Sequence, residues 1–185
     1  MPGPPRGDIE MMRLIGRRIR KWRAGAEFRV SEDIRFSQVP RAIELRSDAF
    51  ANGEPMPALK ASPALRWTGV PPQTKMLALI AEDVDAPLLR PMTHAIAYGI
   101  DPATTSLAEG ALGGDAVEMG YNGAGRRGYV APAPLPGHGV HRYIFTLLAV
   151  DYVPRFDQPP TRGRFLDAIA GHVAALGELT GTFER

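Results

Sequence analysis

The sequence of 185 residues contains no cysteine. Disulfide bonds, thiolate metal sites and a cysteine nucleophile are therefore excluded. No apolar run approaches the ~18 residues that a membrane span needs. The first 25 residues lack the apolar segment and the small-residue cleavage site of a signal peptide, so we expect a cytoplasmic protein. A chain of this length most naturally forms one domain that buries its core without covalent links.

Positive charge is scarce outside the N-terminal segment. The net charge of the whole chain is +2. Residues 1–25 contain seven Arg and Lys residues against Asp8 and Glu10, a net charge of +5, so the remaining 160 residues carry −3. Such a body does not offer a basic surface to nucleic acid, and we expect no nucleic-acid partner.

The N-terminal segment combines its charge with an apolar pattern. A helix over MMRLIGRRIRKWRAG would carry four apolar side chains on one face, namely Met12, Ile15, Ile19 and Trp22. We interpret residues 1–26 as a basic extension, disordered at its start and amphipathic after it. The stripe would pack on the body or on the second subunit of a homodimer. The alternative is peripheral binding of residues 9–23 to an anionic membrane.

From residue 27 the pattern becomes that of short strands. The runs TKMLALIAE (74–82), THAIAYGI (93–100) and HRYIFTLLAV (141–150) are each bounded by Gly, Pro or Asp, as strands are. The loop of about ten residues between the first two runs is too short for a parallel crossover, so we expect antiparallel neighbours. Residues 27–185 are thus predicted to form a mainly β, antiparallel sandwich domain.

A C-terminal helix is expected after these strands. Thr161 can cap it, and it would carry an apolar stripe of Phe165, Ile169, Val173 and Leu176. The last residues, ELTGTFER, would then leave as a short tail or an edge strand.

Two enzyme motifs fail on their context. Residues 123–128, GAGRRG, match the dinucleotide pattern G-x-G-x-x-G, which must open a helix. The next residues, YVAPAPLPG, contain three prolines and cannot begin a long helix, so we interpret 123–128 as a loop. None of the five serines stands in the G-x-S-x-G elbow of a serine hydrolase.

The stretch EDVDAPLLRPMTH, residues 82–94, places acids and a histidine around a turn. Asp83 and Asp85 come just past the end of one strand, and His94 begins the strand that we expect to pair with it. The end of one strand and the start of its antiparallel partner lie at the same edge of a sheet. We therefore expect the two carboxylates and the imidazole to converge.

A second histidine is expected at the same edge. His141 begins another strand, and because side chains alternate along a strand, Tyr143 shares its face while Arg142 points to the other. Each residue alone has an ordinary structural explanation, since aspartate before proline is frequent in turns. Their joint placement favours a site. A metal site, an acid–base catalyst and a pocket for a charged ligand are the alternatives that this cluster leaves open.

Three segments together resemble a known family. They are SPALRWTGVPPQTKMLALIAEDVDAP (62–87), His94 and PLPGHGVHRYIFTLLAVD (134–151). They are similar to the phosphatidylethanolamine-binding protein family, whose bacterial members are often called Raf kinase inhibitor-like proteins. Its pattern is Asp-Pro-Asp-Ala-Pro, a histidine on the next strand, and Gly-x-Pro-Pro-x-Gly followed by His-Arg-Tyr. The resemblance runs from about Phe28 to the C-terminus and leaves out the basic N-terminal segment.

The resemblance implies a β-sandwich with a small anion-accepting pocket at one end and a cis peptide bond between Ala86 and Pro87. It also implies which residues bind the ligand, with residues 129–137 as one wall. These are Asp83, Asp85, Pro87, His94, Tyr129, Ala133, Pro134, Gly137, His141 and Tyr143.

The sequence departs from the family pattern at four positions. Val84 replaces the proline of the first motif, and Leu135 replaces the second of the paired prolines. Ala133 stands where a glycine often approaches the anion, which would narrow the pocket. Phe183 is the nearest match to a C-terminal tyrosine of some members and lacks its hydroxyl.

Two carboxylates in an anion pocket make sense if they act on the histidines. Asp83 can accept a hydrogen bond from an imidazole N–H and hold that ring oriented and charged. Asp85 can use backbone donors to fix the loop. We therefore expect a binding or regulatory module for a small anion, such as phosphate or a phospholipid headgroup, that is no enzyme and needs no metal or cofactor.

Two other functions stay as alternatives. The runner-up is a metal-dependent hydrolase that uses the cluster of Asp83, Asp85, His94 and His141, since two histidines with carboxylates could hold zinc. The third alternative is an inhibitor whose protein target is a kinase or a protease. It is implied only by the resemblance to members of the phosphatidylethanolamine-binding protein family.

Overall fold

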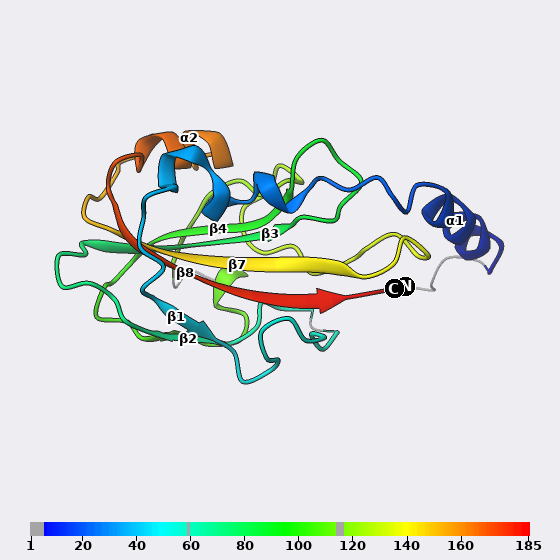
Figure 1. Ribbon diagram of the computed structural model, residues 1–185, viewed down its shortest axis with the longest axis horizontal. Helices are drawn as coiled ribbons and strands as arrows, with labels where there is room; N and C mark the ends of the chain where they lie inside the picture. The colour runs from blue at the N-terminus through cyan, green and yellow to red at the C-terminus, as the bar shows by residue number, and fades with distance from the viewer. Residues whose placement is uncertain (1–5, 59, 114–116) are drawn as a thin grey trace.

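The computed structural model describes residues 6–58, 60–113 and 117–185 of the chain. Two antiparallel sheets face each other (Figure 1), as expected for a sandwich. The larger sheet has the order β6-β4-β3-β7-β8. Its strands are β3 (Met76–Asp83), β4 (Met92–Ile100), β6 (Glu118–Met119), β7 (His141–Val150) and β8 (Val173–Phe183).

The smaller sheet has the order β1-β2-β5. Its strands are β1 (Glu44–Arg46), β2 (Leu65–Thr68) and β5 (Ser106–Leu107). Helical segments are few in the described part of the chain. They are the α-helices α1 (Arg6–Arg18) and α2 (Arg162–Ala168), and the 3-10 helices η1 (Ala26–Phe28), η2 (Val30–Glu32), η3 (Ile34–Phe36) and η4 (Ala111–Gly113).

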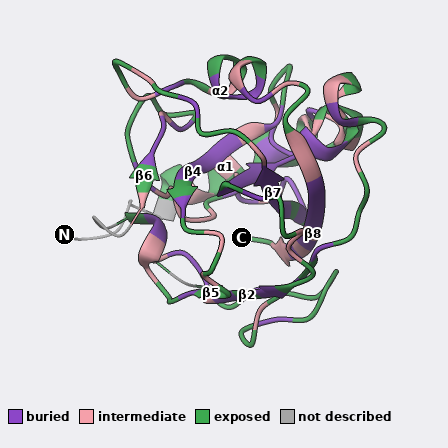
Figure 2. Cartoon of the chain, turned by 90° about the vertical axis from the view of Figure 1, so that its left-hand side faces the viewer, coloured by how far each residue is buried: buried purple, intermediate pink, exposed green. Residues whose placement is uncertain are grey.

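The larger sheet is covered on both faces. One face packs against the smaller sheet through a core that includes Leu77, Leu79 and Phe145. The other face packs under the segment of η1 to η3 and under α2, in a second core that includes Ile80 and Phe165 (Figure 1). Because side chains alternate, a strand buried on both faces needs apolar residues throughout. This is why β3 is an almost continuous apolar run, and the buried strands form the centre of Figure 2.

The predicted strands are confirmed, and so is their pairing. β3 pairs antiparallel with β4, with Asp83 opposite Met92, and with β7, with Asp83 opposite Tyr143. The loop interpretation of 123–128 is also confirmed, because these residues form turns with no helix.

The predicted C-terminal helix was too long. Thr161 is the N-cap residue of α2, although its side chain makes no capping hydrogen bond, and the helix ends at Ala168. Val173 and Leu176 belong to β8, an edge strand that pairs with β7. The chain turns at Gly171, whose φ of +79° suits glycine and stops the helix. The apolar spacing therefore spans a helix, a turn and a strand that cover the same core.

The N-terminal segment is more ordered than expected, since α1 already begins at Arg6; residues 1–5 lie outside the described part. α1 ends at Arg18, so Ile19 and Trp22 of the predicted stripe lie beyond the helix. Ile15 and Trp22 are 47% and 54% exposed. The face of α1 that meets the body has the buried Gly16 at its centre, where an added Cβ would lie 2.2 Å from the carbonyl oxygen of Pro136. No described helix is long and apolar enough to cross a membrane.

Candidate ligand-binding site

A pocket of about 280 Å³ lies at the end of the larger sheet where β3 ends and β4 and β7 begin. The turn after β3 forms one wall, and residues 130–135 form another. The residues that line it are Asp83, Ala86, Pro87, Leu88, Met92, His94, Val130, Ala131, Ala133, Pro134, Leu135, His141 and Tyr143. Most of this lining is apolar, so the few polar groups stand out as the points at which a ligand can be oriented.

The closed half consists of Asp83 and His141, which line the pocket, and of Asp85 behind them; the polar side-chain atoms of all three have partners. Asp83 accepts a hydrogen bond from the backbone N–H of Asp85 at 2.9 Å and one from Nδ1 of His141 at 2.8 Å. The exposed fractions of the Asp83 and His141 side chains are 5% and 1%. The expectation that an aspartate orients a histidine at this edge agrees with this geometry.

Asp85 ties the turn to β7 and does not line the pocket. It accepts hydrogen bonds from the backbone N–H and the guanidinium of Arg142, each at 2.8 Å. Arg23 forms an ion pair with it at 3.0 Å. Burial acts to raise the pKa of Asp85, but the hydrogen bonds from Arg142 and Arg23 outweigh it and hold the pKa at about 2. The carboxylate is therefore charged and fully engaged.

The open half consists of His94 and Tyr143. Nδ1 of His94 donates to the carbonyl oxygen of Val130, because a carbonyl can only accept, and the backbone N–H of Val130 donates back to the carbonyl of His94 at 2.9 Å. Nε2 of His94 and the hydroxyl of Tyr143 are buried and have no hydrogen-bond partner. The two rings meet edge to face, with centroids 5.2 Å apart. Buried polar atoms without partners cost free energy unless a ligand satisfies them.

Burial sets the charge of the open half. It lowers the pKa of the His94 imidazole, while the Val130 carbonyl and the Asp83 charge act in the opposite direction. Burial raises the pKa of the Tyr143 hydroxyl, and the nearby negative charge of Asp83 raises it further. The empty pocket therefore presents a neutral imidazole and a neutral hydroxyl.

The structure brings most of the expected ligand-binding residues to the pocket. Seven of the ten line it, namely Asp83, Pro87, His94, Ala133, Pro134, His141 and Tyr143. Asp85 lies behind the turn, and Tyr129 packs beside His94 with ring centroids 6.4 Å apart. Gly137 lies outside the lining, where its N–H donates to the carbonyl of Arg185 at 3.3 Å.

Two departures from the family pattern have structural consequences. The N–H of Val84 donates to the carbonyl of Arg142 at 3.2 Å, a bond that a proline could not make. Leu135 lines the pocket directly.

The expected cis peptide bond between Ala86 and Pro87 was wrong, since this bond is trans. Phe183 pairs with His141 across β8 and β7.

Sequence reasoning missed the N-terminal segment as part of this site. The N–H groups of Ala24 and Gly25 donate to the carbonyls of Ala86 and Val84 at 2.9 and 3.0 Å. The only local signal for this contact was the positive charge of Arg23, and the sequence did not indicate that its partner is Asp85. The residues before η1 therefore run along the outside of the turn that forms one pocket wall.

The geometry gives no support to a metal centre. In the described ranges there is no group of three or more His, Asp or Glu side chains that could hold a metal ion. The oxygens of Asp83 and Asp85 already accept hydrogen bonds. Asp83 is engaged with His141, and Asp85 with Arg142, so neither carboxylate is held ready for a metal.

A larger cavity of about 650 Å³ lies between β1 and β8, away from the histidines. Its charged lining residues already neutralise one another, as in the ion pairs of Arg41 with Glu178 and of Arg46 with Glu44. We regard the smaller pocket as the site, because it alone combines a lining of histidines with unpartnered polar atoms among the described residues.

The fold and the site define a β-sandwich with a small, mostly apolar pocket that holds two unpartnered polar groups. The family model described as phosphatidylethanolamine-binding protein matches residues 46–184. A UPF0098 protein of Chlamydia muridarum is 37% identical over 153 residues, which cover 77% of this chain and 99% of that protein. The chain belongs to the phosphatidylethanolamine-binding protein family.

Solved structures agree with this assignment. The crystal structure of a putative phosphatidylethanolamine-binding protein homologue from Chlamydia trachomatis has a TM-score of 0.73 and 36% identity, and the match covers 78% of this chain and 99% of that chain. The carboxypeptidase Y inhibitor, solved in complex with its cognate proteinase, shares the fold at a TM-score of 0.50 and 18% identity, with 84% of this chain and 90% of that chain covered.

Proposed function

We propose that the pocket binds a small oxyanion, such as a phosphate group, and that the protein acts as a binding module. One observation carries this proposal: Nε2 of His94 and the hydroxyl of Tyr143 are buried in the pocket without partners. An oxyanion can accept a hydrogen bond from each of them once the His94 ring is charged. The volume of about 280 Å³ suits a small group and little more.

The closed half supports binding more than catalysis. Both carboxylates are engaged in hydrogen bonds, so neither is free to act as a general base on a bound molecule. The described lining contains no serine, threonine or lysine that could serve as a nucleophile. The hydrolase alternative therefore has only the unpartnered Nε2 of His94 as a base or metal ligand, because the carboxylates are engaged with His141 and Arg142.

Calorimetric titration with sulfate tests the pocket. His94→Ala should weaken binding about tenfold or more, because it removes a hydrogen bond to a charged ligand. His172→Ala is the matched control, since His172 is 47% exposed and pairs with Asp151 beyond the far end of β7. Equal sulfate affinity in wild type and His94→Ala would overturn the proposal.

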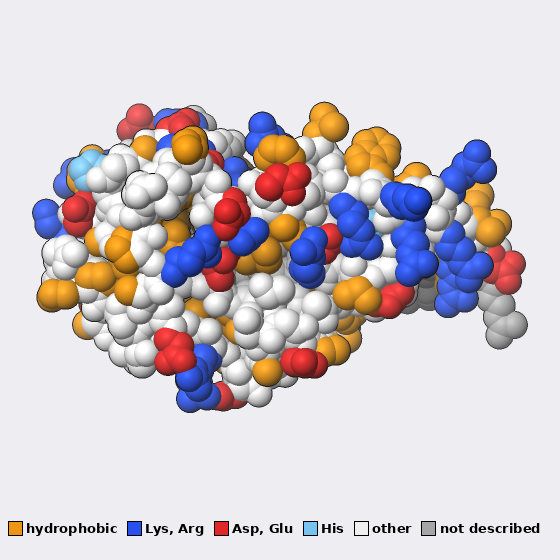
Figure 3. Space-filling view, in the orientation of Figure 1, with side chains coloured by type: hydrophobic (Ala, Val, Ile, Leu, Met, Phe, Trp, Pro, Cys, Tyr) orange, Lys and Arg blue, Asp and Glu red, His pale blue; other side chains and the backbone are white. Residues whose placement is uncertain are grey.

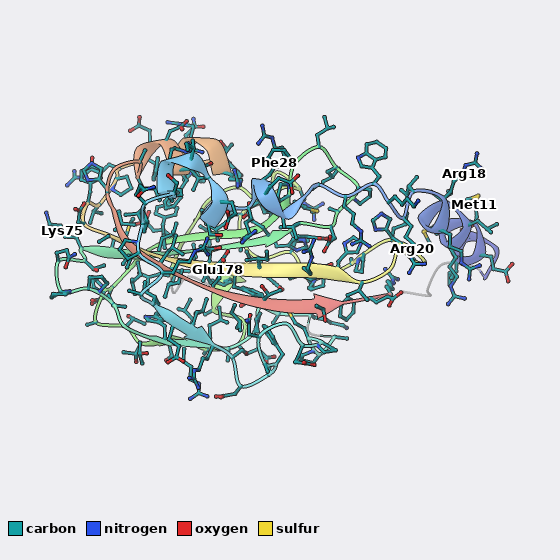
Figure 4. The ribbon with its side chains drawn as sticks, viewed as in Figure 1. Met11, Arg18, Arg20, Phe28, Lys75 and Glu178 are labelled. Carbon is teal, nitrogen blue, oxygen red and sulfur yellow. The ribbon has the colours of Figure 1, made fainter. Side chains whose placement is uncertain are left out.

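For the source of the anion we propose a phospholipid headgroup at a bilayer surface. The pocket is lined by the start of β7 and by the loop before it, and these segments lie at the same end of the molecule as α1 (Figure 1). Lys and Arg side chains gather over this end in Figure 3, and Figure 4 shows Met11, Arg18 and Arg20 projecting there. Exposed apolar side chains accompany them, namely Met11 (57%), Leu14 (66%), Trp22 (54%) and Leu89 (83%). Apolar residues among basic ones are typical of surfaces that bind anionic bilayers.

Co-sedimentation of the full chain with phosphatidylcholine vesicles, with and without anionic phosphatidylglycerol, tests this source. The double variant Met11→Ser/Leu14→Ser should sediment less, and Ile34→Ser/Val153→Ser should not, because Ile34 and Val153 are exposed but lie elsewhere. Sulfate binding should survive both changes, which separates the membrane contact from the pocket. If Met11→Ser/Leu14→Ser alters the oligomeric state and not vesicle binding, Met11 and Leu14 belong to a subunit interface instead.

A kinase or protease target stays a prediction. The carboxypeptidase Y inhibitor resembles this chain in fold alone, so the complex with its proteinase suggests only that this architecture can present a surface to a protease.

A further inference from the structure

His138 is a fully buried histidine in the loop before β7 that the ligand pocket does not use. Its Nδ1 lies 2.7 Å from Nε2 of His141. Its Nε2 lies 3.1 Å from the carbonyl oxygens of both Ile19 and Trp22, in the segment that follows α1. A continuous row of hydrogen bonds thus joins Asp83, His141, His138 and the N-terminal segment.

The number of protons in this row follows from its ends. The carbonyls of Ile19 and Trp22 can only accept, so Nε2 of His138 carries a proton. Asp83 accepts at the other end, at 2.8 Å from Nδ1 of His141. Three links need three protons, whereas two neutral imidazoles supply two. The row therefore holds one extra proton, which balances the negative charge of Asp83.

The groups around the pair decide where that proton lies. Asp83 on β3 faces His141, while the His94 ring on β4 and the Tyr143 hydroxyl on β7 are uncharged in the empty pocket. Arg20 and Arg23 of the N-terminal segment lie beside the loop that holds His138, and Arg142 is turned to Asp85. Burial, and then the charge of His141 and of Arg23, lowers the pKa of His138. Asp83 accepts directly from the His141 ring at 2.8 Å, so the positive charge of the row is compensated best when the extra proton is on His141.

We propose that His138 is a positioning residue that couples the docking of the N-terminal segment to the charge of His141 in the pocket. Loss of the extra proton leaves two protons for three links, and the two accepting ends hold both of them. The facing nitrogens of His141 and His138 then repel each other, which displaces the His138 ring and loosens its hold on the carbonyls that follow α1. The hydrogen bonds of Arg23 to Val140 and of Ala24 to Ala86 contain no histidine and stay intact. The change is thus confined to α1 and the residues up to Trp22. This coupling requires no ligand in the pocket.

Hydrogen exchange of the full chain, corrected for intrinsic rates, tests the coupling. Protection of residues 7–22 should fall at least about tenfold between pH 6 and pH 9, the effect of one lost charge-assisted hydrogen bond, while that of β3 stays unchanged. His138→Phe keeps a ring but no hydrogen bond, so residues 7–22 should exchange fast at every pH. His138→Gln keeps a donor that does not titrate, so protection should remain at every pH. His172→Phe is the control at an exposed histidine.

A second measurement needs no variant. The ¹⁵N resonances of the His141 ring report directly whether both nitrogens carry protons, and at pH 6 they should show a doubly protonated imidazolium. A neutral His141 ring under that condition would overturn the proposal. Two results from hydrogen exchange would also overturn it. One is protection of residues 7–22 that does not change with pH in the wild type, and the other is protection that His138→Phe leaves unaffected.

Discussion

The closed and the open half of the pocket differ in how their buried polar atoms are used. In the closed half, each polar side-chain atom of Asp83 and His141 has a hydrogen-bond partner. In the open half, His94 and Tyr143 each have a polar atom that is equally buried and has none. A protein selected for stability alone would not keep such atoms. This difference supports the proposal that the open half meets a ligand, while the hydrogen bonds of the closed half hold its side chains in place.

Breaking the closed half should have the largest effect. Asp83→Asn removes the negative charge and leaves the His138–His141 pair with an uncompensated buried proton. We expect the free energy of unfolding to fall by about 3 kcal/mol, as for other buried ion pairs that lose one partner. Urea denaturation measures it, with the exposed Asp157 changed to Asn as the control. A loss no greater than that of the control would mean that the closed half is not held by charge.

Low pH should break the ion pairs of Asp85, which lies behind the closed half of the pocket. The folded-state pKa of Asp85 is about 2, below its ordinary value of 3.8, so its stabilisation is present above pH 4 and is lost as the pH falls toward 2. The loss should be at most roughly 2 kcal/mol, because Arg142 is half exposed and its charge is screened.

Denaturant unfolding of wild type and Asp85→Asn between pH 5 and pH 2 checks this prediction. The stability difference between the two proteins should shrink as the pH falls. Curves that stay parallel would contradict it.

The open half should respond to pH through binding. An oxyanion prefers the charged His94 ring, and burial lowers the pKa of that ring in the empty pocket below its ordinary value of 6.5. Sulfate affinity should therefore rise by up to about tenfold per unit as the pH falls, and should still rise below pH 6.5. Calorimetry with sulfate, which stays fully ionised, separates this effect from the titration of phosphate. Affinity that levels off above pH 6.5 would place the charge on another group.

The smallest effect on stability is expected at Tyr143. Tyr143→Phe removes a buried hydroxyl that has no partner, so the free energy of unfolding should stay within about 1 kcal/mol of the wild-type value or increase. Sulfate binding should weaken in the same variant. Thermal unfolding and calorimetry on one preparation measure both. A large loss of stability would show that the hydroxyl has a structural partner after all.

Local patterns were enough to predict the strands and their convergence. β3, β4 and β7 are apolar runs between turn residues, and the pairing of β3 with β4 follows from the length of one loop. From this, the joint position of Asp83, His94 and His141 could be inferred before the structure was known.

What the sequence could not indicate depends on distant partners. Val173 and Leu176 fit a helical spacing, and only the pairing with β7 shows that they form a strand. The carbonyls that hold His138 lie 116 and 119 residues away from it. An imidazole three residues before His141 was a visible signal, but nothing local shows that it is buried. The use of the Val84 N–H likewise depends on the position of β7.

The distance between His138 and Ile19 also has a consequence for the order of events during synthesis. A ribosome adds roughly 5–20 residues per second, so Ile19 is made some 6–24 seconds before its partner 119 residues later. An isolated helix of 13 residues is only marginally stable in water. The N-terminal segment therefore spends its first seconds as an unpaired, cationic chain outside the exit tunnel, and it becomes a fixed helix only when the last third of the protein arrives.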